Sequence, residues 1–110
     1  MDPSVWLKLS TVEQLANVGA EVGRAITWRV NPAYGDPKLS FYRALEYLGL
    51  TINDPKLTAF RRRELCRVRE VLIDWYYSLG TYRTTDDDWV RYFNQFGIAA
   101  NLAKHHIQGK

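Results

Sequence analysis

Three side chains in the sequence can supply thiolate or imidazole groups for a metal site or a nucleophile: the only cysteine, Cys66, and the two histidines, His105 and His106. A closed zinc site needs more thiolate or imidazole ligands than these three residues supply. A nucleophilic cysteine needs a histidine partner, which here comes only from the C-terminal tail. The acidic run at residues 86–88 suits the start of a helix, whose dipole favours anions, better than a cation site. We therefore predict no enzyme activity, no metal and no cofactor.

Positive charge is concentrated in one short segment. The chain carries a net charge of +3, and outside residues 61–70 its basic and acidic residues balance. Arginine forks bind both phosphates and carboxylates, so this segment predicts either a solvated helix face or a surface for nucleic acid or another anionic partner. The interleaved acidic residues and the small net charge favour the solvated face. A binding affinity that falls steeply as the salt concentration rises would indicate the alternative. The candidate contacts with nucleic acid or another anionic partner are Arg61, Arg62, Arg63, Arg67 and Arg69.

A second polar face contains a tryptophan. At about 100° per residue, four side chains of a helix over residues 11–29 fall opposite its apolar stripe. They are Asn17, Glu21, Arg24 and Trp28. Ion pairing in solvent accounts for the three polar residues but not for Trp28. Tryptophan and arginine dominate interface hot spots, so this face is also a candidate contact with another protein subunit.

Four segments repeat apolar residues at helical spacing, and none alternates as a half-buried strand does. They cover residues 11–29, 36–49, 58–79 and 84–104. Ser10 to Glu13 fits a capping box, Asp36 precedes a proline, and Gly80 fits the left-handed residue that ends a helix. Short connections favour antiparallel neighbours. The sequence therefore predicts an all-α fold, an up-down-up-down antiparallel four-helix bundle, as one domain over residues 1–110.

The composition is that of a soluble globular domain, with 46% hydrophobic, 14% aromatic and 25% charged residues. We expect Trp6, Trp75 and Trp89 to pack in its core, because aromatic residues at helical spacing usually do. A weaker hypothesis is a small-molecule pocket among these three and Tyr76. One cysteine excludes an internal disulfide, and the N-terminus lacks the pattern of a signal peptide, so we expect a cytoplasmic protein.

A family resemblance rests on five segments: residues 6–9 (WLKL), 13–22 (EQLANVGAEV), 43–46 (RALE), 50–55 (LTINDP) and 69–74 (REVLID). In these segments, which span most of the chain, the sequence resembles a family of small uncharacterised bacterial proteins of similar length. The resemblance implies a free-standing helical domain and no assigned activity.

Four-helix bundles of the HEPN type are a looser analogy. Their RNase members use an arginine followed a few residues later by a histidine, whereas residues 98–101, where that arginine would fall, read IAAN. The RNase motif is therefore absent. The hypothesis that the chain is an inactive relative that binds a nucleotidyltransferase or nucleic acid rests on fold analogy alone.

Together these features predict a non-enzymatic protein that acts by protein–protein interaction, as a homodimer or as a subunit of a complex. The polar face around Trp28 is the predicted interface, and burial of Trp28 in the core of its own bundle would contradict that prediction. Binding of nucleic acid or another anionic partner through the arginine-rich segment is the alternative.

Overall fold

The computed structural model describes residues 2–108 of the chain, and their side chains as far as residue 104. The predictions about the side chains of His105 and His106 therefore lie outside the described residues. All regular secondary structure in the described range is helical, so the predicted all-α class is confirmed. The elements are α1 (Pro3–Trp6), α2 (Thr11–Val30), the 3-10 turn η1 (Pro32–Tyr34), α3 (Pro37–Ile52), α4 (Ala59–Tyr77) and α5 (Asp86–Gln108).

Local sequence explains where the long helices begin. Ser10 and Glu13 form the predicted capping box at the start of α2, because each side chain accepts the other's backbone N–H at 3.1 Å. Asp36 caps α3 just ahead of a proline, as predicted, and Thr58 caps α4. These caps satisfy backbone N–H groups that have no partner inside a helix.

The ends of two helices differ from the prediction. α4 ends at Tyr77, with Ser78 as its left-handed cap (φ 54°), so the prediction that Gly80 ends this helix is wrong. The physical reason is the buried carboxylate of Asp74, which accepts two backbone N–H groups of the following loop at 2.8 and 3.1 Å. These bonds draw the loop back onto the last turn of α4. α5 continues to Gln108 instead of ending near residue 104.

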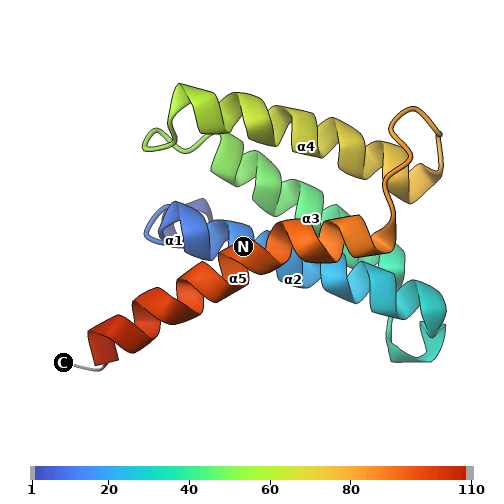
Figure 1. The fold of residues 1–110 in the computed structure, drawn as a ribbon, viewed down its shortest axis with the longest axis horizontal. Helices are drawn as coiled ribbons and strands as arrows, with labels where there is room; N and C mark the ends of the chain where they lie inside the picture. The colour runs from blue at the N-terminus through green and yellow to red at the C-terminus, as the bar shows by residue number, and fades with distance from the viewer. Residues whose placement is uncertain (1, 109–110) are drawn as a thin grey trace.

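α2 is the central helix: α3 and α5 both pack against it, and α4 lies over α3 (Figure 1). The four long helices run in alternating directions in this view, and α5 crosses α2 at an angle. The crossing is close because residue 19 is glycine; a Cβ there would lie 2.6 Å from Phe93 Cβ. The finer prediction of an up-down-up-down antiparallel four-helix bundle is not confirmed by this crossed arrangement.

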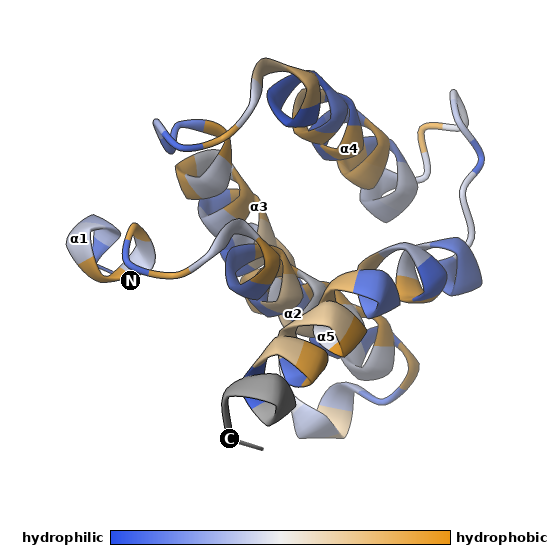
Figure 2. Cartoon of the chain, turned by 60° about the vertical axis from the view of Figure 1, so that its left-hand side comes forward, coloured by the Kyte–Doolittle hydropathy of each residue, from blue (hydrophilic) through white to orange (hydrophobic). Residues whose placement is uncertain are grey.

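One hydrophobic core joins all five helices. The tryptophans predicted to lie in the core, Trp6, Trp75 and Trp89, are 0%, 7% and 5% exposed, so this prediction is confirmed. Figure 2 shows apolar and hydrophilic stretches on different sides of the long helices. Trp6 stacks on Tyr47 at 4.9 Å, whereas Trp75 and Trp89 meet each other at 6.4 Å. The residues of the predicted small-molecule pocket, which also included Tyr76, are therefore not gathered in one place.

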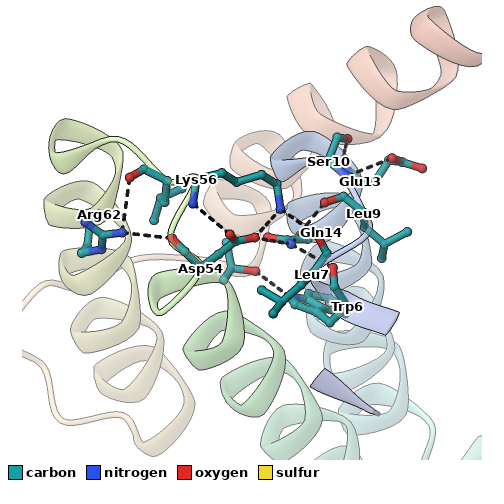
Figure 3. A network of polar contacts seen from close by, with 11 residues as sticks. Trp6, Leu7, Leu9, Ser10, Glu13, Gln14, Asp54, Lys56 and Arg62 are labelled. Carbon is teal, nitrogen blue, oxygen red and sulfur yellow. Dashed lines mark hydrogen bonds and ion pairs between the residues drawn. The ribbon is translucent and has the colours of Figure 1, made fainter. Parts of the chain in front are cut away.

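A buried polar network ties α1 to α2 and to the connection between α3 and α4 (Figure 3). Gln14 Nε2 lies 3.0 Å from the Trp6 carbonyl oxygen and 2.9 Å from Asp54 Oδ2. The Trp6 indole donates to Thr51 Oγ1 at 3.0 Å, and Lys56 pairs with the Asp54 carboxylate. Burial raises the pKa of Asp54, but hydrogen bonds from Lys56 and Gln14 outweigh it and hold this pKa below its ordinary value.

Candidate interaction surface

The polar face predicted on α2 is not one open surface. Asn17 and Arg24 are exposed, but Glu21 is buried beneath α3, and the prediction that it points outward is wrong. Its carboxylate accepts hydrogen bonds from Ser40 Oγ at 2.6 Å and from Arg24 Nη1 at 2.7 Å. α3 packs on this side of α2, which the spacing of residues within α2 does not reveal. Glu21 therefore links α2 to α3 by a hydrogen bond.

Trp28, the predicted interface anchor, is half-buried near the C-terminal end of α2. Its ring lies against Gly35, where an added Cβ would come within 2.7 Å of ring atom Cδ2. Trp28 thus supports the turn that includes Tyr34, and it does not belong to the hydrophobic core of the described residues. The role of Asn17, Glu21, Arg24 and Trp28 in an interface stays a prediction.

Two of the arginines predicted to contact an anionic partner make hydrogen bonds or ion pairs within the chain itself. Arg62 donates to the carbonyl oxygen of Ile52, the last residue of α3, at 2.9 Å. It also donates to two carbonyl oxygens in the connection between α3 and α4, at 3.0 and 3.3 Å (Figure 3). Arg61 pairs with Glu64 at 2.9 Å, and its guanidinium lies over the Phe96 ring. Both guanidiniums therefore take part in the chain's own fold, although each keeps N–H donors that these bonds do not use.

The other three arginines, Arg63, Arg67 and Arg69, are exposed on α4. Arg67 bonds the Tyr82 hydroxyl at 3.0 Å and lies 3.8 Å from the Glu70 carboxylate. Exposed ion pairs of this kind contribute little stability. Binding of nucleic acid or another anionic partner stays a prediction, with the same five candidate arginines, Arg61, Arg62, Arg63, Arg67 and Arg69.

Replacing Arg62 by alanine should lower the free energy of unfolding by about 2 kcal/mol, because three carbonyl oxygens lose a charged donor. Arg63→Ala is the matched control: this neighbouring side chain is exposed, and its loss should change stability by less than about 0.5 kcal/mol. Urea unfolding followed by circular dichroism measures both values. Equal losses in the two variants would contradict the structural role of Arg62.

α2 and α4 end, and α3 begins, at one end of the molecule (Figure 1). The segments that meet there carry several large apolar side chains that are exposed. Single exposed apolar residues are normal on a protein surface, but a group of them marks a site of interaction. Their exposed fractions run from 47% to 81%. We call this surface the aromatic end, and its residues are Val30, Tyr34, Leu39, Tyr42, Tyr77 and Leu79.

The aromatic end rests on a base of packed rings. Phe41 is fully buried and stacks on Tyr76, with ring centroids 3.9 Å apart and an interplanar angle of 5°. Arg29 donates to the Tyr76 carbonyl oxygen at 2.7 Å and lies 4.6 Å over its ring. Tyr77 meets Phe41 edge-on at 5.9 Å, and the neighbouring hydroxyl of Tyr42 raises the pKa of Tyr77. A surface held in this way needs little ordering when it binds a partner.

On α3, opposite charges flank the exposed apolar residues. At about 100° per residue, four exposed side chains share one side of the helix, within an arc of about 100°. We call them the α3 stripe: Lys38, Leu39, Tyr42 and Glu46. Lys38 lies four residues before Tyr42, and Glu46 lies four residues after it. Neither charged side chain has an ion-pair partner within the described part of the chain.

Sequence reasoning missed the α3 stripe, although a signal for it was present. The spacing of Phe41, Leu45 and Leu48 identifies the core face of this helix. Leu39 and Tyr42, three residues apart, fall on a different face of the same helix, between a lysine and a glutamate. A second apolar pair outside the core face, with a charge of each sign beside it, indicates a contact outside the chain's own core.

Neither a membrane-spanning helix nor a metal cluster is found in the described residues. No helix there is both long and apolar enough to cross a membrane. Within the same range, no three potential metal-ligating side chains lie close enough together to hold an ion. No protein-family model, curated protein or solved structure matches the chain. The resemblance to a family of small bacterial helical proteins stays a prediction.

Proposed function

We propose that the chain acts by protein–protein interaction as a homodimer, in which the α3 stripe of one copy packs antiparallel against that of the other. In this proposal the protein has no catalytic centre or cofactor of its own, and its long helices act as an up-down-up-down four-helix bundle. An exposed, unpaired Cys66 suits the reducing environment of the cytoplasm, where we propose that the dimer works.

The order of charges along the α3 stripe is the observation on which the proposal rests. A two-fold axis that passes beside Tyr42 makes the two copies of α3 antiparallel. A residue a given number of positions before Tyr42 in one copy then lies opposite the residue the same number of positions after Tyr42 in the partner. Lys38 and Glu46 are equally spaced from Tyr42, so Lys38 of each copy faces the partner's Glu46. Each ion pair lies about 6 Å along the helix from the axis. The stripe is therefore complementary to a second copy of itself, in charge as well as in apolar character.

The exposed surface of the chain is larger than that of a compact monomer of its mass. The chain exposes 7022 Å², with a mass of 12.8 kDa. A compact monomer of this mass exposes about 6,300 Å². The larger area fits an elongated shape of 44 × 31 × 26 Å, in which α5 extends beyond the other helices (Figure 1). The α3 stripe with the rest of the aromatic end offers apolar area for a contact with a second copy.

A charge swap tests the antiparallel pairing. Lys38→Glu and Glu46→Lys should each raise the dimer dissociation constant roughly 30-fold, because each turns two attractions across the axis into two repulsions. The double variant Lys38→Glu/Glu46→Lys restores opposite charges and should restore the dimer. Sedimentation equilibrium measures all three constants, with Lys8→Glu as the control because Lys8 is exposed outside the aromatic end. A double variant weaker than either single variant would contradict this pairing.

A further inference from the structure

The exposed side of α4 is more positive than the sequence of this helix indicates. α4 contains three acidic residues, and two of them are used inside the fold. Glu64 accepts a hydrogen bond from the Tyr92 hydroxyl of α5 at 2.6 Å and pairs with Arg61. Asp74 is buried and accepts backbone N–H groups of the loop that follows. Within α4, which the structure describes in full, Glu70 is therefore the only exposed acidic residue.

Three exposed arginines face this single acid. Arg67 lies 3.8 Å from Glu70, but both side chains are about two-thirds exposed, so solvent screens this pair. Arg63 and Arg69 have no ion pair with any described residue. We call this side the outer face of α4, and its charged and large apolar residues are Phe60, Arg63, Arg67, Arg69 and Glu70.

An aromatic ring lies beside the arginines of the outer face. Phe60 is 73% exposed and does not belong to the hydrophobic core of the described residues. At about 100° per residue, Phe60, Arg63 and Arg67 fall within an arc of about 60° on α4. A single exposed apolar residue is ordinary on a protein surface. An exposed ring in a row of arginines, however, combines the two groups that hold a single-stranded nucleic acid, one for its bases and one for its phosphates.

The residue types favour nucleic acid over an acidic protein. All five basic residues of α4 are arginines, and none is a lysine. A guanidinium fork matches two oxygens of a phosphate, and its plane also stacks on a base, which an ammonium group does not do. The bases of a duplex are stacked on one another, whereas a single strand leaves the face of a base free for an aromatic ring.

We propose that the outer face of α4 binds single-stranded nucleic acid, with a base stacked on Phe60 and backbone phosphates on Arg63, Arg67 and Arg69. This binding does not depend on the proposed dimer, because none of these residues belongs to the α3 stripe. Phe60 and Arg63 are about 4.5 Å apart along the helix axis, and Arg63 and Arg67 are about 6 Å apart. One strand that follows the helix axis can therefore contact all three side chains.

A fluorescently labelled oligouridylate of about ten nucleotides is the probe, and fluorescence anisotropy measures its association constant. We expect binding at about 50 mM salt. The logarithm of the association constant should fall with the logarithm of the salt concentration with a slope of about −2, the value for three phosphate contacts on a single strand. No binding at this salt concentration would overturn the proposal. Displacement of the probe by polyglutamate as readily as by unlabelled oligouridylate would also overturn it, because the surface would then bind any acidic chain.

Two variants separate the two kinds of contact. Phe60→Ala should weaken binding roughly tenfold and leave the salt slope unchanged, because it removes stacking and no charge. Arg63→Gln should weaken binding and make the slope less steep by about 0.7, because one phosphate contact is lost.

Arg91→Gln is the control for both variants. The Arg91 side chain is 76% exposed on α5, away from the outer face of α4, and this variant should bind as the wild type does. All three positions are exposed, so the variants should keep their helices, which circular dichroism checks. Wild-type affinity in Phe60→Ala, or equal losses in Arg63→Gln and Arg91→Gln, would show that the probe responds to net charge and not to this face.

Discussion

Replacing Gln14 by alanine should lower the free energy of unfolding by about 3 kcal/mol, the largest stability loss that we expect from a single polar side chain. Gln14 is fully buried, and its Nε2 lies near three acceptors, the carbonyl oxygens of Trp6 and Leu9 and the carboxylate of Asp54. Because all three neighbours are acceptors, they also fix which way the amide points. Alanine would leave them without this donor and would open a cavity beneath α1.

Gln95→Ala is the matched control for this prediction. Gln95 is exposed on α5, and its Nε2 donates to one carbonyl oxygen at 2.9 Å, so solvent can replace that bond. Its loss should change the free energy of unfolding by less than about 0.5 kcal/mol. Urea titrations of the wild type and the two variants give the comparison. A Gln14→Ala variant as stable as Gln95→Ala would show that the buried network contributes little to the fold.

Replacing Tyr42 by glutamate should raise the dimer dissociation constant by more than about 100-fold. In the proposed dimer, Tyr42 of each copy lies beside the two-fold axis, so the substitution puts two carboxylates next to each other in an apolar contact. Like charges at such a position cost free energy through both desolvation and repulsion. Since 49% of Tyr42 is exposed in the single chain, the folded monomer should tolerate the change.

Phe60→Glu makes the same kind of change outside the aromatic end. Phe60 is 73% exposed and lies at the start of α4, away from the α3 stripe. Sedimentation equilibrium should give the wild-type dissociation constant for this control, and circular dichroism should show that both variants keep their helices. If Phe60→Glu weakens the dimer as much as Tyr42→Glu does, the contact does not lie at the aromatic end.

Sequence alone predicted the features that depend on local interactions. The capping box of Ser10 and Glu13 and the Asp36 cap each involve residues close together in the chain, so their geometry follows from the spacing of residue types. Trp6, Trp75 and Trp89 lie in the core because a large apolar ring is stabilised wherever it is buried. The all-α class follows from the same repeated spacing.

The features that sequence reasoning missed depend on which helices are neighbours. Glu21 and Arg62 have the residue types of a solvated surface, yet one bonds Ser40 and the other bonds carbonyl oxygens near the end of α3. Asp74 likewise looks like a surface acid, but it is buried and holds the loop that follows α4. The position of a polar residue along its helix is the same whether its side chain bonds water or a neighbouring helix or loop. Only the packing of the helices distinguishes the two cases.

Sedimentation velocity of the wild-type chain over a range of concentrations tests the proposed self-association most directly. If the α3 stripe joins two copies, the sedimenting species should have the mass of two chains at high concentration and that of one chain on dilution. A species with the mass of one chain at every concentration, up to the highest that stays in solution, would contradict the proposed homodimer.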